Sequence, residues 1–258
     1  MNVQQLIQQI KLKKNVLCVG LDSDIDKIPA HLNKNQFLFN KEIIDATKAY
    51  CVAYKLNTAF YESVGTTGWQ ALEDTINYIP DTHYIIADAK RGDIGNTAIH
   101  YAKTFFETMS FDAVTVSPYM GLDTIQPFLN YPNKVAIVLA LTSNMGSNDF
   151  QQLTLKTALN DKKLFEEVIS QTKKLGDKNK LMFVVGATKI EHLKGIRSLL
   201  PNHFLLIPGV GTQGGDLDEI LKIALTKDGG ILVNVSRDII FNDNSTNFAQ
   251  FASIKAME

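Results

Sequence analysis

Eight short runs rich in Val, Ile and Leu recur along the chain, and they limit its fold more than any other feature. Polar and apolar residues do not alternate within them, so each run is expected to form a strand covered on both faces, as in a parallel sheet. The runs occupy residues 16–21, 51–56, 84–88, 113–117, 135–141, 181–186, 203–209 and 230–236.

Helical patterns separate consecutive runs, as in FNKEIIDATKAY (39–50) and LDEILKIAL (217–225), and the weakest of them is LDTIQPFLN (122–130). Eight strand–helix units predict an α/β protein with a TIM (β/α)8 barrel. An open doubly wound sheet is the structural alternative, because periodicity alone does not show whether the first and last strands pair.

We expect one domain over residues 1–258, because no linker rich in Gly, Pro or Ser and no shift in composition divides the chain. Val3, Leu6, Ile7 and Ile10 stand at helical spacing and predict a short helix before the first strand. The longest polar connection, 142–163, follows the fifth run. Loops after barrel strands build the active face, so this loop is a candidate cover for a ligand.

Composition points to a small soluble ligand. The formal net charge is −1 with both signs scattered, which argues against binding to nucleic acid or to an anionic membrane. Cys18 and Cys51 adjoin apolar segments without CxxC spacing and are typical of core residues in a reducing compartment. Residues 1–14 lack the apolar stretch of a signal peptide, and no run is long enough to span a bilayer. We therefore expect a cytoplasmic protein.

Charged residues directly follow the third apolar run, in ADAKRGDI (87–94). Asp88 and Lys90 are two positions apart, so on a strand they would point the same way at its carboxyl end, where barrel enzymes hold their chemistry. Taken alone, such a DxKxxD stretch is more often a solvated salt bridge. Asp93 is equally well placed to cap the next helix.

Two further charges are expected at the same rim: Lys55 stands at the carboxyl end of the second run and Asp22 follows the first. Each has a structural explanation, since Lys55 could extend out of the barrel mouth and Asp22 could form an Asx turn. Together, two acids and two lysines would keep one another charged, which suits transfer of a proton from a lysine to carbon.

The segment IPGVGTQGGD (207–216) contains four glycines at and after the end of the seventh run. Gly209, Gly211 and Gly214 match the dinucleotide fingerprint GxGxxG, but only about 45 residues follow, too few for the rest of that fold. In a barrel, the loops after strands seven and eight commonly bind phosphate. Arg237 after the eighth run adds a guanidinium, for which a surface ion pair is the alternative. The pattern favours a phosphorylated ligand.

Other chemistries find little support. The histidines show neither HxH nor HExxH spacing, so no metal site is predicted. Neither a GxSxG elbow nor a GxxxxGK[ST] phosphate loop is present.

Lys55, DAKRGDI, LTSN and PGVGTQGGD together resemble the orotidine 5′-phosphate decarboxylase family, in particular its longer bacterial branch. The resemblance runs from GLDSD to SRDI with every motif in family order. DxKxxD is shared with related sugar-phosphate barrels, but joined to PGxGxQGGD and the late arginine it is specific. The resemblance implies conversion of orotidine 5′-phosphate to UMP in de novo pyrimidine biosynthesis, without cofactor or metal.

The resemblance also implies roles for single residues. Lys90 would donate a proton to C6 of the pyrimidine, Asp88 would lie beside the departing carboxylate, and Lys55 and Asp93 would complete an alternating charge array. Asp93 would reach into the neighbouring subunit's site, which implies a homodimer with shared sites, and Ile94 and Thr97 would accompany it.

The other implied contacts involve the nucleotide itself. Asp22 would contact the ribose hydroxyls, Ser143 the pyrimidine edge and Pro208 the apolar side of the base. The phosphate would be held by Gln213 and Arg237, with the glycines around Gly209 closing over it. Many relatives have Gly before the arginine, whereas this chain has Ser236, whose N–H can still donate.

Two other functions fit part of the pattern. A sugar-phosphate barrel such as a 3-keto-gulonate-phosphate decarboxylase or a hexulose-phosphate synthase also carries DxKxxD but needs Mg²⁺, so activity that survives EDTA would decide against it. A non-catalytic nucleotide sensor would bind UMP tightly without turnover. The presence of Lys55, Asp88, Lys90 and Asp93 together argues against the sensor.

Overall fold

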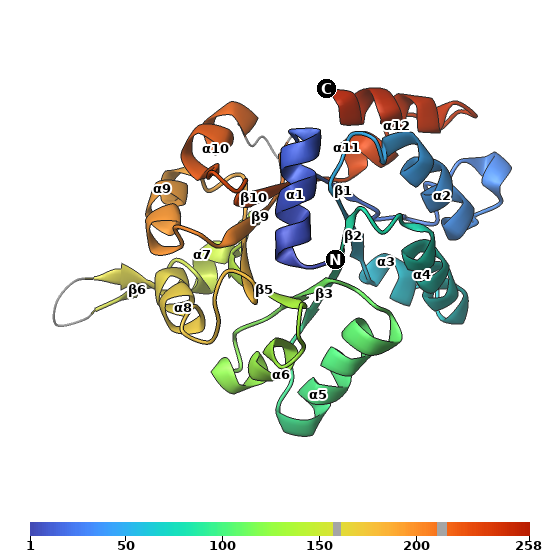
Figure 1. Cartoon of the computed structure of the whole chain (residues 1–258). Helices are drawn as coiled ribbons and strands as arrows, with labels where there is room; N and C mark the ends of the chain where they lie inside the picture. The colour runs from blue at the N-terminus through green and yellow to red at the C-terminus, as the bar shows by residue number, and fades with distance from the viewer. Residues whose placement is uncertain (157–160, 211–215) are drawn as a thin grey trace.

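The computed structural model describes residues 1–156, 161–210 and 216–258. Eight parallel strands close into a barrel in the order β1-β10-β9-β8-β5-β4-β3-β2 (Figure 1). Cys18 of β1 pairs with Asn234 of β10, so the first and last strands meet and the barrel prediction is confirmed over the open sheet. The strands are β1 (Leu17–Gly20), β2 (Ala53–Asn57), β3 (Tyr84–Arg91), β4 (Ala113–Val116), β5 (Val135–Leu141), β8 (Leu181–Val185), β9 (Phe204–Pro208) and β10 (Ile231–Val235).

Helices surround the barrel and bury their apolar faces against the outward side chains of the strands (Figure 1). The α-helices around it are α2 (Gln36–Thr47), α3 (Ala59–Glu62), α4 (Thr66–Tyr78), α5 (Gly95–Lys103), α6 (Gln126–Leu129), α8 (Leu164–Thr172), α9 (Ile190–Leu199), α10 (Leu217–Ala224), α11 (Arg237–Ile240) and α12 (Phe248–Met257). A π-turn (Thr104–Thr108) extends α5, and 3₁₀ turns occupy Ala30–Leu32 and Leu122–Thr124. The weak pattern at 122–130 therefore forms only two short turns.

The predicted N-terminal helix is α1 (Val3–Lys13), and it closes the amino end of the barrel. Val3, Leu6, Ile7 and Ile10 are buried among inward side chains of the strands, such as Tyr84. Burying each of these aliphatic groups contributes roughly 2 kcal/mol before the entropy of ordering is subtracted. Figure 1 shows this helix in front of the strands, near the centre of the view.

The long connection after β5 carries structure of its own. It contains α7 (Ser147–Phe150) and an antiparallel pair formed by β6 (Thr154–Leu155) and β7 (Lys162–Lys163). This pair extends away from the barrel (Figure 1). The suggestion that residues 142–163 cover a ligand stays a prediction.

Both cysteines are free thiols in the core, as predicted. Burial raises the pKa of the Cys51 thiol to about 11. Among the described residues, no helix combines the length and the apolar character that crossing a bilayer requires.

Candidate active site

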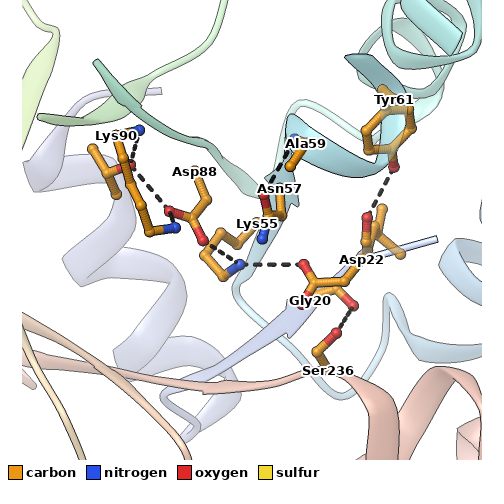
Figure 2. A network of polar contacts seen from close by, with 11 residues as sticks. Gly20, Asp22, Lys55, Asn57, Ala59, Tyr61, Asp88, Lys90 and Ser236 are labelled. Atoms are coloured by element: carbon orange, nitrogen blue, oxygen red, sulfur yellow. Dashed lines mark hydrogen bonds and ion pairs between the residues drawn. The ribbon is translucent and has the colours of Figure 1, made fainter. Parts of the chain in front are cut away.

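Three neighbouring strands bring four charged side chains together at the carboxyl end of the barrel (Figure 2). The Lys55 ammonium on β2 donates to Asp22 Oδ1 at 3.3 Å and to Asp88 Oδ2 at 2.9 Å. The Lys90 ammonium donates to the other oxygen, Asp88 Oδ1, at 2.6 Å. Asp88 thus bridges both lysines, and the charges alternate in sign from Asp22 to Lys90.

Mutual attraction keeps the inner pair of this array ionised. Burial alone would raise the pKa of Asp88, but the ammonium groups of Lys55 and Lys90 outweigh it and hold this pKa well below the usual range. Burial would likewise lower the pKa of Lys55, but Asp22 and Asp88 raise it above the usual range. The Lys55 side chain is only 4% exposed, whereas that of Lys90 is 50% exposed at the rim.

Lys90 reaches Asp88 through an irregular strand end. Strand β3 continues to Arg91, three residues past the expected end, and its pairing with β4 shifts between Ala87 and Arg91. Lys90 has a φ of 49°, a left-handed conformation that is uncommon for residues other than Gly. Such backbone strain costs about 1 kcal/mol or more and gathers at functional sites. The side chains of Asp88 and Lys90 meet as predicted, but a distorted strand and not regular alternation brings them together.

Thr115 of β4 holds the Asp88 side chain and the Lys90 backbone, and the sequence interpretation missed it. Its hydroxyl donates to Asp88 Oδ1 at 3.1 Å and accepts from the Lys90 backbone N–H at 2.9 Å. The signal in the sequence was slight: Thr115 is the one polar residue inside the run AVTV, at a position that faces into the barrel.

A buried network behind the array holds the segment that carries Asp22. Tyr61 of α3 donates to the Leu21 carbonyl at 2.9 Å, and the Ser23 hydroxyl donates to the Asn40 amide oxygen. Asn40 of α2 donates in turn to the Tyr61 hydroxyl at 3.0 Å. The backbone on both sides of Asp22 is therefore tied to the surrounding helices.

A cavity of about 150 Å³ connects the array with the region after β9 and β10. Ser236 donates its hydroxyl to the Gly20 carbonyl at 3.0 Å and so ties the end of β10 to β1 (Figure 2). Gly209 has a φ of 94°, which a side chain would strain. The cavity is lined by Asp22, Lys55, Asp88, Pro208, Gly209, Val210, Asn234, Ser236 and Arg237.

The other predicted contacts do not line this cavity within one chain. Ser143 follows β5, and its carbonyl accepts a hydrogen bond from Thr188 at 3.2 Å. Asp93 Oδ1 accepts from the Ile94 N–H at 2.8 Å, and Ile94 and Thr97 are exposed. The alternative that Asp93 caps a helix is wrong, because the N-cap of α5 is Ile94.

Gln213, Gly211 and Gly214 lie outside the described residues. Within the described ranges, no three His, Cys, Asp or Glu side chains are placed to hold a metal ion together.

Comparison with known proteins agrees with this geometry. Residues 15–250 match the family described as orotidine 5′-phosphate decarboxylase / HUMPS. Orotidine 5′-phosphate decarboxylase of Christiangramia forsetii is 55% identical over 99% of this chain and 95% of its own.

Two solved structures from Leishmania donovani resemble the fold. Its OMP decarboxylase is 35% identical, with 98% of this chain and 96% of that chain covered and a TM-score of 0.82. Its UMP synthase is 36% identical, with a TM-score of 0.84. The match covers 98% of this chain but only 54% of that protein. The match to a family model over most of the chain, with relatives above half identity, places this chain in the orotidine 5′-phosphate decarboxylase family, as a carboxy-lyase of pyrimidine biosynthesis.

Proposed function

We propose that this chain converts orotidine 5′-phosphate to UMP without a metal or organic cofactor, with Lys90 donating the proton to C6. The observation that carries the proposal is the continuous array of Lys55, Asp88 and Lys90, which adjoins a cavity that also contains Arg237 and Gly209. The charge array would act on the pyrimidine, and the part of the cavity that contains Arg237 and Gly209 would bind the phosphate.

The chemistry calls for fixed charge. Cleavage of the bond between C6 and the carboxylate leaves an electron pair in the plane of the ring, where the π system does not delocalise it. CO₂ departs, and a proton from the Lys90 ammonium joins that pair to give UMP. A preorganised ammonium stabilises the developing anion more than the bound substrate. Asp88, kept ionised by its two lysines, would repel the substrate carboxylate and favour its loss.

The remote phosphate would contribute to turnover as well as to affinity. Arg237 presents a planar set of donors that suits two phosphate oxygens. Binding energy gained there can hold the pyrimidine against the charge array during the reaction. Orotidine, which lacks the phosphate, should therefore show a lower kcat than orotidine 5′-phosphate; equal turnover of the two would remove this part of the mechanism.

The central test incubates the purified protein with orotidine 5′-phosphate in EDTA and follows release of CO₂ and UMP. We expect turnover under these conditions, and we expect Lys90→Ala to lose turnover while UMP binding remains measurable. Loss of activity in EDTA that Mg²⁺ restores would instead favour a sugar-phosphate barrel enzyme. Tight UMP binding with no turnover by the unaltered chain would favour a sensor.

We further propose a homodimer in which Asp93 enters the partner's site. Within one chain, the described contacts of the Asp93 side chain include none to the array. Apolar side chains near it in the sequence and after β4 are exposed, among them Ile94 at 61% at the N-cap of α5, Ile99 at 51% on α5 and Met120 at 47% after β4. Several exposed apolar residues near a charged site residue suit a subunit interface. Ile94 and Thr97 would then lie against the partner's nucleotide.

We place the protein in the cytoplasm as a single barrel domain over residues 1–258. Its substrate and product are soluble nucleotides, and its two cysteines are buried free thiols, which suits a reducing compartment. The scattered charges support a small-molecule substrate and not nucleic acid.

A further inference from the structure

Strand β10 carries a polar side chain inside the barrel, Asn234, whose amide oxygen has no hydrogen-bond partner among the residues that the structure describes. Asn234 is 6% exposed, and its amide oxygen lacks a hydrogen-bond partner. A buried acceptor without a partner is costly, so proteins rarely keep one without a reason. The other unpartnered buried side chains in the described ranges, such as Ser147 and His203, lie outside the cavity beside the charge array.

The strand geometry directs Asn234 into that cavity. Asn234 and Ser236 face inward, while Val233 and Val235 between and beside them face the surrounding helices. Asn234 lines the same cavity as Lys55, which belongs to the array, and Arg237, which belongs to the proposed phosphate site. Gly20 leaves room for it, because a Cβ at Gly20 would lie 3.3 Å from the Asn234 oxygen.

The missing partner must be a hydrogen-bond donor. An amide oxygen only accepts, whereas the oxygens of a phosphate dianion carry no hydrogen. The nearby Ser236 hydroxyl is already used by the Gly20 carbonyl. Between its base and its phosphate, a nucleotide offers the ribose hydroxyls, each of which can donate one hydrogen bond and accept others.

Lys55 can donate a hydrogen bond to the same ribose hydroxyl. An ammonium has three N–H donors, and Asp22 and Asp88 accept two of those of Lys55. We propose that Asn234 positions the nucleotide: a ribose hydroxyl accepts the third N–H of Lys55 and donates to the Asn234 amide oxygen. The inference rests on the function proposed above and adds a residue that selects ribonucleotides over deoxyribonucleotides.

The test measures binding of UMP, 2′-deoxy-UMP and 3′-deoxy-UMP by calorimetry to the unaltered protein and to Asn234→Leu. The unaltered protein should bind one of the two deoxynucleotides about tenfold more weakly than UMP, the size expected for one hydrogen bond. Asn234→Leu should bind UMP about tenfold more weakly and should no longer distinguish UMP from that deoxynucleotide. Asn234→Ala repeats the measurement if the Leu variant does not fold.

Thr172→Val is the matched control, because Thr172 is buried on α8 and donates to the Val168 carbonyl at 2.7 Å, away from the cavity. It should lose stability and keep the discrimination between nucleotides. A folded Asn234 variant with unchanged discrimination would overturn the inference. Turnover of orotidine 5′-phosphate by the unaltered chain reports separately on the proposed function, so the two failures are distinguishable.

Discussion

Asp88 is an anion almost enclosed by protein, with a side chain that is 12% exposed. An isolated carboxylate in such a place would take up a proton. The ammonium groups on its two oxygens prevent this by holding the pKa of Asp88 well below the usual range, so the charge that would face the substrate carboxylate persists at neutral and mildly acidic pH. An acidic limb in the pH–rate profile should therefore not be assigned to Asp88.

Thr115 should affect the rate through its contact with Asp88 and Lys90. Thr115→Val removes one hydrogen bond to the carboxylate and leaves the Lys90 N–H without its acceptor. A hydrogen bond to a charged group contributes about 2 kcal/mol, so kcat should fall by about tenfold or more. Steady-state kinetics measure this, with Thr172→Val as the control. A kcat equal to that of the unaltered chain would show that Thr115 does not position the array.

His83 should make stability depend on pH. It is 3% exposed beside the Lys13 ammonium, and burial together with this charge lowers its pKa to about 4. The unfolded histidine has a pKa of about 6.5, so between these values the unfolded chain binds a proton that the folded chain does not. Stability should therefore fall as the pH drops through this window.

Replacing His83 isolates that contribution. Between pH 7 and pH 4.5, the free energy of unfolding should fall by roughly 2 kcal/mol more in the unaltered protein than in His83→Gln. Urea unfolding at both pH values measures the difference. Equal losses in the two proteins would mean that His83 is protonated in the fold.

The sequence allowed the charged residues at the ends of the apolar runs to be predicted as site residues. It did not allow this for polar residues that lie within a run and face into the barrel. Lys55, Asp88 and Asp22 were predicted at one rim because they stand where a barrel strand ends. Thr115 and Asn234 belong to apolar runs, and only the closed barrel shows which side of each strand faces the cavity. Their roles depend on partners from other strands, which a single run does not reveal.

At the scale of elements, helices α2 and α3 fix the segment after β1. Asn40→Ala removes the hydrogen bonds that Asn40 donates to Tyr61 and Thr75, and it takes away the acceptor of the Ser23 hydroxyl. We expect a loss of about 2 kcal/mol in the free energy of unfolding and a higher KM, because Asp22 is no longer held.

Thr47→Val on the same helix provides the comparison. It breaks a buried hydrogen bond to Tyr54, which is not part of the network around Asp22. Urea unfolding should show a loss of stability in both variants, and kinetics should show the rise in KM only for Asn40→Ala. A normal KM in a destabilised Asn40→Ala would mean that the network is purely structural.

The hydrophobic periodicity of the sequence predicted the order and type of the strands and helices. It did not predict where some of them end. All eight barrel strands formed within or close to the apolar runs, because burial on both faces demands such runs. The extension of β3 depends on pairing with β4, and the β6–β7 pair consists of only two residues on each strand. Neither of these two features coincides with an apolar run in the sequence.

At the scale of the whole molecule, the proposed homodimer can be tested by complementation. Lys90→Ala and Asp93→Ala should each be inactive, because each variant lacks one charge in every site. Mixing them should restore up to about a quarter of the activity at random subunit exchange, through hybrid dimers with one intact site. Activity assays combined with proof of exchange measure this. Exchange without recovery would show that Asp93 acts within its own chain.

The position of α1 governs how molecules enter and leave. Because this helix seals the amino end and apolar side chains fill the interior above it, the barrel is no tunnel. The substrate must therefore enter, and CO₂ and UMP must leave, through the opening at the opposite, carboxyl end of the barrel. UMP that remains bound there keeps the next substrate molecule out, so UMP should act as a competitive inhibitor and the product would slow its own formation.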